Sequence, residues 1–391
     1  MRPGWTEMPM RPQRGKPRKK SDRRTSIDDR KEILERARQV EESFKVRPQL
    51  YLVGSLEKGL TVYGQQVRAH NLVWALWEFL RPEHDSPRRI AVVGGGITGL
   101  TAVACALSRM KQARITLFER FWDLCPLQQG SDSRWLNPRI YEWPEYGSRV
   151  PGASLPVLNW TEGRASDVAR DILRQFSLYC ERHDESHDRL RVYLGLTHLR
   201  ITAANNRIEW MGSRAAEPGP SFRAGSGEGG DDAFDTIILA PGFGLEKTPA
   251  DFPTPSYWRN EQRGQPVLSG TRQSYMISGY GDSALVDLFR LTIGRFRQDT
   301  ILYELFDGQL GEFEETLRKA RSSMMVGQND LDLFRRLPRD EMNGAQTRLA
   351  RRIRMDTTVV MHLAGKNALI SSLRQVFDGP SSLLNKPCLS G

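Results

Sequence analysis

The chain has 391 residues, of which 39% are hydrophobic and 27% are charged, and its formal net charge is +10. This composition is typical of a soluble globular protein with two or three domains, and no apolar run approaches the ~18 residues that span a bilayer. The four cysteines are scattered and form no CxxC pair, which argues against a disulfide framework, a zinc ribbon and a dithiol redox centre. No secretory signal is evident either, so we expect a reducing, cytoplasmic location.

The excess positive charge is concentrated in residues 1–24, which hold nine Lys and Arg against two acidic residues. Because this stretch contains Pro and Gly and has no apolar periodicity, residues 1–26 are predicted to form a disordered basic tail. Such a tail makes weak, salt-sensitive contacts with nucleic acid or an acidic surface, or serves only solubility. The remaining chain is close to neutral, so its charge does not indicate a nucleic-acid enzyme.

Residues 27–88 are predicted to be an N-terminal helical extension. Apolar residues recur at helical spacing over Asp28–Phe44 and again over Leu60–Leu80, where Pro82 follows the expected end of the helix. A short strand is expected between them, at Pro48–Val53. We expect this extension to pack against the domain that follows.

A strand, a glycine-rich turn, a helix and a second strand follow one another over residues 89–120. Ile90–Val93 is β-branched, and the second strand, Arg114–Phe118, ends on Glu119, twenty positions after Gly99. The turn fits G-x-G-x-x-G and consists of Gly94, Gly95, Gly96, Ile97, Thr98 and Gly99.

Each part of this pattern has a physical role in dinucleotide binding. Gly94 permits a tight turn, Gly96 lets the backbone approach a pyrophosphate, and Gly99 allows close helix–strand packing. The helix N-terminus offers N–H groups and partial positive charge to the pyrophosphate. Glu119 can accept hydrogen bonds from ribose hydroxyls and would repel a 2′-phosphate. The alternative is a glycine turn in an α/β protein that binds no nucleotide.

The sequence VVGGGITGL with its terminal LFER resembles the N-terminal FAD-binding unit of the two-dinucleotide-binding-domain flavoproteins. The resemblance covers residues 89–120 and is closer to an FAD site than to an NAD site. It implies an α/β, Rossmann-like FAD/NAD(P)-binding fold, with an FAD-binding domain over residues 89–245. In this reading Arg120 belongs to the cofactor site together with Glu119.

Residues 121–160 are unusually rich in aromatic residues and proline, and show few signs of regular structure. Long loops of this kind are commonly functional, so we expect this one to face a cofactor or substrate. The resemblance implies that Gly130 and Arg134 hold the pyrophosphate, Arg134 as a bidentate donor, while Trp135 or Trp143 offers a flat surface near the flavin. The alternative is that these aromatic rings are core packing beneath a structural loop.

The segment that follows is predicted to alternate helix and strands. A helix is expected over Thr161–His183, a strand pair over Leu190–Ile201, a strand over Ile208–Met211 and a flexible loop over Gly219–Asp232. His183 and His187 lie four residues apart, but no third ligand is evident, and we predict no metal site.

The sequence DTIILAPGFG, residues 235–244, is a second point of resemblance. A buried strand, Thr236–Ala240, runs into a glycine turn that resembles the A-T-G motif of the flavoproteins, with Pro241 in the place of threonine. A plain turn at the end of a strand fits the residues equally well.

A third point of resemblance lies in the predicted second domain, residues 246–391. A strand, Tyr275–Ser278, meets a turn and a helix, and a strand over Asp299–Glu304 would complete a second β-α-β unit. The turn contains Gly279, Gly281 and Asp282, with Ala284 in the place of the third glycine.

This turn has two readings as a cofactor site. It resembles the start of the NAD(P)-binding domain of thioredoxin-reductase-like proteins, but Gly281 and Asp282 also resemble the motif that binds the flavin ribityl chain. Chain order favours the nicotinamide reading, in which Glu304 and Asp307 favour NAD. The remaining alternative is a helix start capped by Asp282 or Ser283.

The end of the chain is predicted to add more elements to the second domain. We expect helices over residues 311–320, 330–336, 345–354 and 368–377 and a strand over Thr357–Leu363.

Together these features predict an FAD-dependent oxidoreductase that uses NAD(P)H as hydride donor to the flavin. No catalytic residue can be named. The alternative is a non-catalytic FAD/NAD(P)-binding sensor or regulatory subunit that acts with a partner protein. The small-molecule substrate and the oligomeric state, homo-oligomer included, are not encoded in any recognisable motif.

Overall fold

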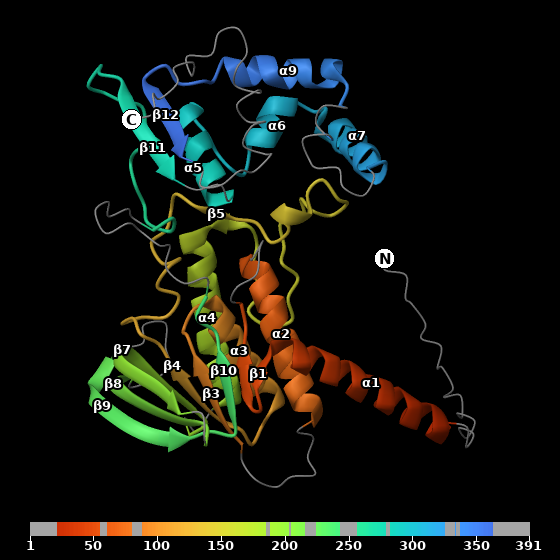
Figure 1. Ribbon diagram of the computed structural model, residues 1–391, viewed down its shortest axis with the longest axis vertical. Coiled ribbons are helices and arrows are strands. Elements are labelled where there is room, and N and C mark those ends of the chain that lie inside the picture. Colours follow the sequence, from red (N-terminus) through yellow and green to blue (C-terminus); the bar gives the residue numbers. More distant parts are fainter. Residues whose placement is uncertain are drawn as a thin grey trace, which may run out of the picture.

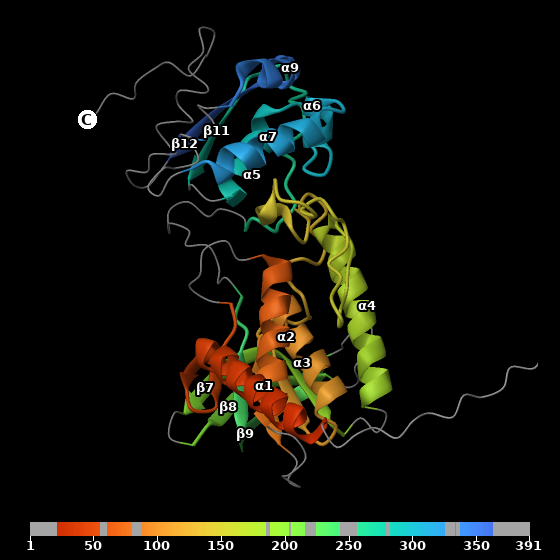
Figure 2. The same ribbon diagram turned by 90° about the vertical axis from the view of Figure 1, so that its right-hand side faces the viewer.

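The computed structural model describes residues 22–54, 61–79, 88–184, 188–202, 205–215, 224–242, 256–278, 282–324, 333 and 337–362. Most of the predicted basic tail, the helix predicted at 368–377 and all of segment 330–336 except Leu333 lie outside these residues. The described chain forms a lower part built on a large sheet and an upper part of shorter helices and two strands, with α4 (Ala165–His183) rising between them (Figures 1 and 2).

The described residues contain an eight-stranded sheet with the order β1-β2-β10-β3-β4-β7-β8-β9. Its central strands, from β2 to β7, are parallel, whereas β1, β8 and β9 pair antiparallel to their neighbours. The bounds are Lys45–Arg47 for β1, Leu50–Leu52 for β2, Arg89–Val93 for β3, Arg114–Phe118 for β4, Leu190–Thr202 for β7, Arg207–Ala215 for β8, Ala224–Ala233 for β9 and Thr236–Leu239 for β10.

Helices cover one face of this sheet. The connections β2-α2-β3, β3-α3-β4 and β4-α4-β7 each return to a parallel strand, and their helices are α2 (Val62–Phe79), α3 (Ile97–Arg109) and α4. One apolar core joins these three helices to the sheet. Strand β10, the last of these strands in the chain, is inserted between β2 and β3, and this arrangement of parallel strands and connecting helices is Rossmann-like.

The N-terminal extension is part of the sheet. Helix α1 (Asp22–Phe44) packs on α2, and β2 pairs in parallel with β10. The predicted helices and strand of residues 27–88 are therefore confirmed, and the strand adds a further β-α-β unit before the glycine-rich turn.

The opposite face of the sheet carries a cluster of aromatic rings from Phe118, Tyr193, Trp210 and Phe234. The loop predicted over Gly219–Asp232 is wrong from residue 224 onward, because strand β9 occupies this stretch. Pairing with β8 outweighs the weak strand propensity of its glycines, and Gly230 is needed there: a Cβ would lie 2.5 Å from the Trp210 ring.

The upper part differs from the predicted second β-α-β unit. Strand β11 (Gln273–Ser278) and α5 (Asp282–Thr292) are confirmed, but residues 301–306 form helix α6 (Ile301–Phe306) in place of a strand. The apolar side chains of α6 recur at helical spacing and pack into a core with Phe313 and Leu317, which explains the error.

The parallel partner of β11 is instead β12 (Thr357–His362). Helices α7 (Leu310–Ser322) and α9 (Arg339–Ala350) complete the upper part, and α9 ends before the predicted Arg354. Small elements, β5 (Trp135–Leu136), β6 (Gly163–Arg164) and a 3-10 turn at Ile140–Glu142, lie in and just after the aromatic loop. Within the described residues, no helix combines the length and apolar character needed to cross a membrane.

Candidate cofactor site

Three neighbouring strands end in a row at the carboxyl edge of the sheet, and a glycine with positive φ closely follows each one. These glycines are Gly54 after β2 (φ +90°), Gly242 after β10 (φ +71°) and Gly94 after β3 (φ +116°). Ligands of open α/β sheets bind in the crevice outside the carboxyl ends of the strands. The glycine-rich turn therefore lies where the fold places a ligand.

Two glycines of the turn are fixed by close backbone contacts. A Cβ on Gly94 would lie 2.1 Å from the carbonyl oxygen of Ala240, and one on Gly99 would lie 1.8 Å from the carbonyl oxygen of Gly94. Ala240 comes from the segment that resembles the A-T-G motif, and its N–H donates to the Val93 carbonyl at 2.7 Å. The first and second points of resemblance thus meet at this turn.

Gly96 differs from Gly94 and Gly99, because a Cβ added at Gly96 would meet no atom within 4 Å apart from its neighbours in the chain. Gly96 is the N-cap of α3, and no side chain caps the helix there. Among the described residues, no acceptor is found for the N–H groups of Gly96, Ile97 and Thr98. An open space next to the N-terminus of a helix is the geometry that binds a pyrophosphate, so these residues fit the ADP half of a dinucleotide.

Glu119 lies beside this space at the end of β4. Its side chain is buried, and its carboxylate accepts hydrogen bonds from the N–H groups of Gly95 and Phe121, the latter at 2.8 Å. A carboxylate has about four lone-pair positions, so two remain for ribose hydroxyls. The neighbouring Arg120 is exposed, and its guanidinium lies 4.8 Å from the centre of the Phe121 ring.

Trp122 is an exposed aromatic residue near Glu119 that the sequence does not single out from the other tryptophans. Its side chain is 65% exposed, and its ring lies against Gly195, where a Cβ would approach it to 2.5 Å. The isolated glycine within strand β7 is the signal in the sequence that another group approaches closely.

Arg134 is buried, and its partners come from the upper part of the molecule. Its guanidinium donates to the Tyr257 carbonyl and pairs with Asp287 at 2.6 Å, and it stacks over the Tyr257 ring at 4.0 Å. These contacts favour a role in joining the two parts of the chain over the predicted role at a pyrophosphate.

The tryptophans predicted to lie near the flavin are placed differently from one another. Trp135 is half-buried in β5, next to Arg164 of β6. Trp143 donates to Glu314 of α7 at 2.8 Å and lies near Phe313, so it packs on the upper part. For Trp143 the structure favours the packing alternative.

The second predicted turn is only partly described. Gly279 and Gly281 lie outside the described residues, and Asp282 is an exposed residue in the first turn of α5. Glu304, which was expected to favour NAD from a strand tip, lies on α6 and pairs with Arg352. Asp307 follows α6 in the left-handed conformation. The two acidic residues therefore give no support to an NAD preference.

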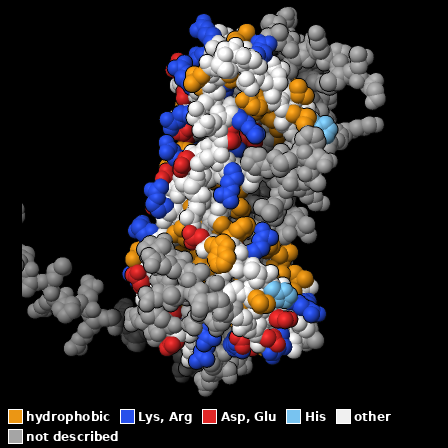
Figure 3. Space-filling model, turned by 90° about the vertical axis from the view of Figure 1, so that its left-hand side faces the viewer, with side chains coloured by type: hydrophobic (Ala, Val, Ile, Leu, Met, Phe, Trp, Pro, Cys, Tyr) orange, Lys and Arg blue, Asp and Glu red, His pale blue; other side chains and the backbone are white. Residues whose placement is uncertain are grey.

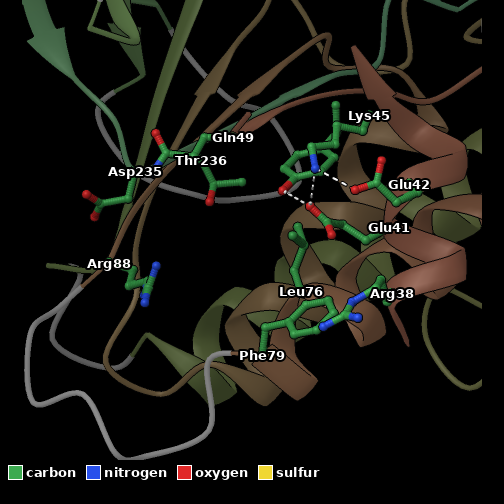
Figure 4. Close-up of a pocket in the computed structure, with 11 residues that line it drawn as sticks. Arg38, Glu41, Glu42, Lys45, Gln49, Leu76, Phe79, Arg88, Asp235 and Thr236 are labelled. Carbon is green, nitrogen blue, oxygen red and sulfur yellow. Dashed lines mark hydrogen bonds and ion pairs between the residues drawn. The ribbon is translucent and has the colours of Figure 1, made fainter. Parts of the chain in front are cut away.

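A hollow lies at the opposite edge of the sheet, away from the glycine-rich turn. It has a volume of about 450 Å³ and is lined by α1, α2 and the residues that precede the strands, including Arg88 and Asp235 (Figure 4). Lys45 pairs there with Glu41 and Glu42, and Glu41 accepts from Tyr51, whose pKa is raised by burial and by these carboxylates. Because it is at the amino ends of the strands, this hollow is not the predicted cofactor site.

A smaller hollow of about 300 Å³ lies at the junction of the two parts, next to Arg134 and Trp135. Its arginines are largely paired with acids: Arg297 with Asp299, and Arg290 with Glu261. Lys and Arg side chains also follow one edge of the face shown in Figure 3.

Within the described residues, no group of three His, Cys, Asp or Glu side chains could hold a metal ion. Burial raises the pKa of the Cys105 thiol to about 12 and of the Cys180 thiol to about 12, and it also raises the pKa of Cys125. These three buried thiols are poor nucleophiles.

No protein-family model matches the sequence, and no curated protein matches it. Among solved structures, the chain is similar to the reduced form of ornithine hydroxylase PvdA from Pseudomonas aeruginosa, with 17% identity over 52% of this chain and 42% of that protein, at a TM-score of 0.26. It is also similar to L-lysine 6-monooxygenase from Pseudomonas syringae, with 18% identity over 52% of this chain and 42% of that protein, at a TM-score of 0.26.

A third similar structure is ornithine N-hydroxylase KtzI from Kutzneria sp. 744, described with reduced FAD, NADP+ and L-orn. It has 15% identity over 49% of this chain and 42% of that protein, at a TM-score of 0.22. The match thus spans less than half of each of these three proteins. Likenesses this weak leave the assignment to the geometry of the chain itself.

Proposed function

We propose that the chain is an FAD-dependent oxidoreductase that takes hydride from NAD(P)H. The observation that carries the proposal is the open space over Gly96, at the N-terminus of α3 and at the carboxyl edge of the sheet. Gly94–Gly99 would hold the pyrophosphate, and Glu119 would accept from the ribose. The bound flavin would supply the redox chemistry.

The residues of the chain would bind and orient the cofactor. The N–H groups at the start of α3 stabilise negative charge, and the Gly94 and Gly99 contacts keep the turn close to the sheet. Residues 121–160 lead from Glu119 to the junction with the upper part, where Arg134 joins Asp287. A substrate would therefore reach the flavin near this junction.

The absorbance spectrum of the purified protein tests the proposal, followed by anaerobic addition of NADH and of NADPH. Flavin bands that bleach with either donor are expected. In a folded Gly96→Asp protein, the added carboxylate occupies the pyrophosphate position, so the flavin should be lost. Full flavin content in that variant, or a wild-type protein that cannot be reconstituted with FAD, would contradict the assignment.

The alternative function is a non-catalytic FAD/NAD(P)-binding sensor that acts with a partner protein. It is favoured by the small size of the upper sheet, which pairs only β11 with β12 among the described residues. A protein that retains FAD but does not bleach with NADH or NADPH would support this alternative over the oxidoreductase.

A further inference from the structure

The hollow of about 300 Å³ at the junction is lined by residues of both parts of the molecule. Arg134 and Arg164 come from β5, β6 and the residues beside them. Arg290 and Phe296 come from α5 and the segment that precedes α6. Figure 1 shows β5 directly below α5, and the ion pair of Arg134 with Asp287 spans the same junction. A ligand in this hollow would therefore contact both parts.

Arginine side chains give the lining of this hollow an excess of positive charge, because it contains four arginines and two aspartates. Arg134 pairs with Asp287 at 2.6 Å. Arg290 pairs with Glu261 at 2.7 Å. Neither of these two carboxylates is among the groups that line the hollow. Burial lowers the pKa of Arg290 and the positive charge of Arg134 lowers it further, so the two guanidinium groups are close enough to repel each other.

Both guanidinium groups keep donors that have no partner. Arg134 is 3% exposed, and its Nε and Nη1 donate to Tyr257 and Asp287, but its Nη2 makes no hydrogen bond among the described residues. Arg290 Nη1 is buried and lies 4.0 Å from Asp287, which is too far for a hydrogen bond, and it has no other partner in the described structure. Enclosed charged donors without partners oppose folding, and a bound anion would offset that cost.

Further donors line the same hollow. Ser133 Oγ is buried without a partner, and the side chains of Arg164 and Gln298 make no hydrogen bond within the described part of the chain. The backbone that carries Ser133 is held by Asn260, whose side-chain oxygen accepts from the N–H groups of Asp132 at 2.9 Å and of Ser133 at 3.0 Å. These donors are therefore presented by a fixed loop.

Two aromatic rings add an apolar surface to the hollow. Trp135 and Phe296 both line it and are half-buried. Phe296 also packs against Phe289 of α5, with the ring centres 6.0 Å apart. A ligand that meets arginines and aromatic rings in one small hollow combines an anionic group with a flat apolar body.

We propose that the hollow binds the oxyanion of a small aromatic ligand, a carboxylate or a phosphate, with Arg134 and Arg290 as its main ligands. The planar fork of a guanidinium matches both kinds of oxyanion, and the volume of the hollow suits a small molecule. The inference does not depend on a bound flavin. The oxyanion has two sources, the carboxylate of an aromatic substrate or a phosphate of a nucleotide.

Isothermal titration calorimetry on the full-length protein, at constant ionic strength, tests the inference. Benzoate and phenyl phosphate should bind with a saturable signal, about tenfold or more tightly than acetate and inorganic phosphate, because only the first two carry a ring. Tighter binding of benzoate would assign the hollow to a carboxylate. Tighter binding of phenyl phosphate and of 2′,5′-ADP would assign it to a nucleotide phosphate.

Two variants locate the binding in this hollow. Arg290→Lys keeps a positive charge beside Glu261 but loses the fork, so Kd for the tighter probe should rise about tenfold. Arg164→Gln removes an exposed arginine at the hollow and should raise Kd about threefold. Arg170→Gln is the matched control, since it removes an equal charge from an exposed pair with Asp167, and its Kd should equal that of the wild type.

The Gly96→Asp protein separates this hollow from the candidate cofactor site, because the added carboxylate blocks the glycine-rich turn alone and should leave Kd for benzoate and phenyl phosphate unchanged. If Arg290→Lys does not fold, as thermal unfolding would show, Ser133→Ala takes its place and should also weaken binding. The inference is overturned if no probe binds saturably, or if the variants at the hollow weaken binding no more than Arg170→Gln does. Failure to bind FAD would contradict the proposed function and not this inference.

Discussion

The Cα of Gly94 lies against the carbonyl oxygen of Ala240, so that a Cβ on Gly94 would be 2.1 Å from that oxygen. The contact joins the turn after β3 to the end of β10, although these residues are far apart in sequence. It sets the position of the turn relative to the sheet and leaves Gly96, two residues later, facing open space.

Alanine substitutions at Gly94 and Gly96 should change different properties: the stability of the fold at Gly94 and the affinity for FAD at Gly96. Gly94→Ala adds a Cβ that clashes with backbone at a φ of +116°, so it should lower the free energy of unfolding by at least about 2 kcal/mol. Gly96→Ala has room and an ordinary φ of −74°, so its stability should change by less than about 1 kcal/mol while its FAD affinity falls. Urea unfolding without FAD and FAD titration measure the two effects, and equal stability losses would show that the two sites do not differ as described.

The pair Arg134–Asp287 should stabilise the junction between the lower and upper parts. Asp287→Asn leaves the buried Arg134 guanidinium without its carboxylate, so the free energy of unfolding should fall by about 1–3 kcal/mol. This loss is smaller than for a fully buried ion pair, because Asp287 is 36% exposed and water screens its charge. Arg134→Met should cost less, since the remaining Asp287 stays solvated and lies 4.0 Å from Arg290.

Urea unfolding of both single variants and of the double variant measures the coupling between Arg134 and Asp287. Arg170→Met is the control, because Arg170 forms an exposed ion pair with Asp167 and should matter by less than about 1 kcal/mol. A double variant whose loss equals the sum of the single losses would show that the pair is not coupled.

His70 should make the protein less stable in acid. Burial lowers the pKa of His70, with a smaller lowering by the positive charge of Arg109, so the folded protein protonates this imidazole at a lower pH than the unfolded chain does. The unfolded chain takes up a proton below a pKa of about 6.5, and the free energy of unfolding should therefore fall as the pH drops through that value.

Urea unfolding at several pH values from about 8 to about 5 measures how steeply the free energy of unfolding falls with pH. His70→Leu should flatten it. His183→Asn separates a second contribution, because burial also lowers the pKa of the less enclosed His183. A slope that is identical in wild type and His70→Leu would exclude His70 as its origin.

The sequence predicts local features of this fold better than distant pairings. The turn Gly94–Gly99 is readable because its strand, glycines and helix are contiguous, and the structure places each of them as expected. The strand predicted over Asp299–Glu304 is wrong, because the parallel partner of β11 lies at Thr357–His362, far along the chain. Strand β9 was missed because its pairing with β8, and not its own composition, makes it a strand.

The candidate site shows the same division. Glu119 is found from its spacing to the glycines, and the structure places it beside the turn. Arg134 has the residue type expected of an anion ligand, yet its partner Asp287 belongs to a different part of the chain.

Strand β10 lies between β2 and β3 and pairs with both. During synthesis on the ribosome, β2 and β3 emerge long before residues 236–239, so the sheet has a vacant central position until that strand arrives. A nascent chain at this stage exposes two unpaired strand edges that face one another, the kind of edge that recruits strands from other chains. Closure of the sheet by β10 therefore both completes the row of strand ends at the candidate cofactor site and covers the two strand edges that are otherwise open to pairing with other chains.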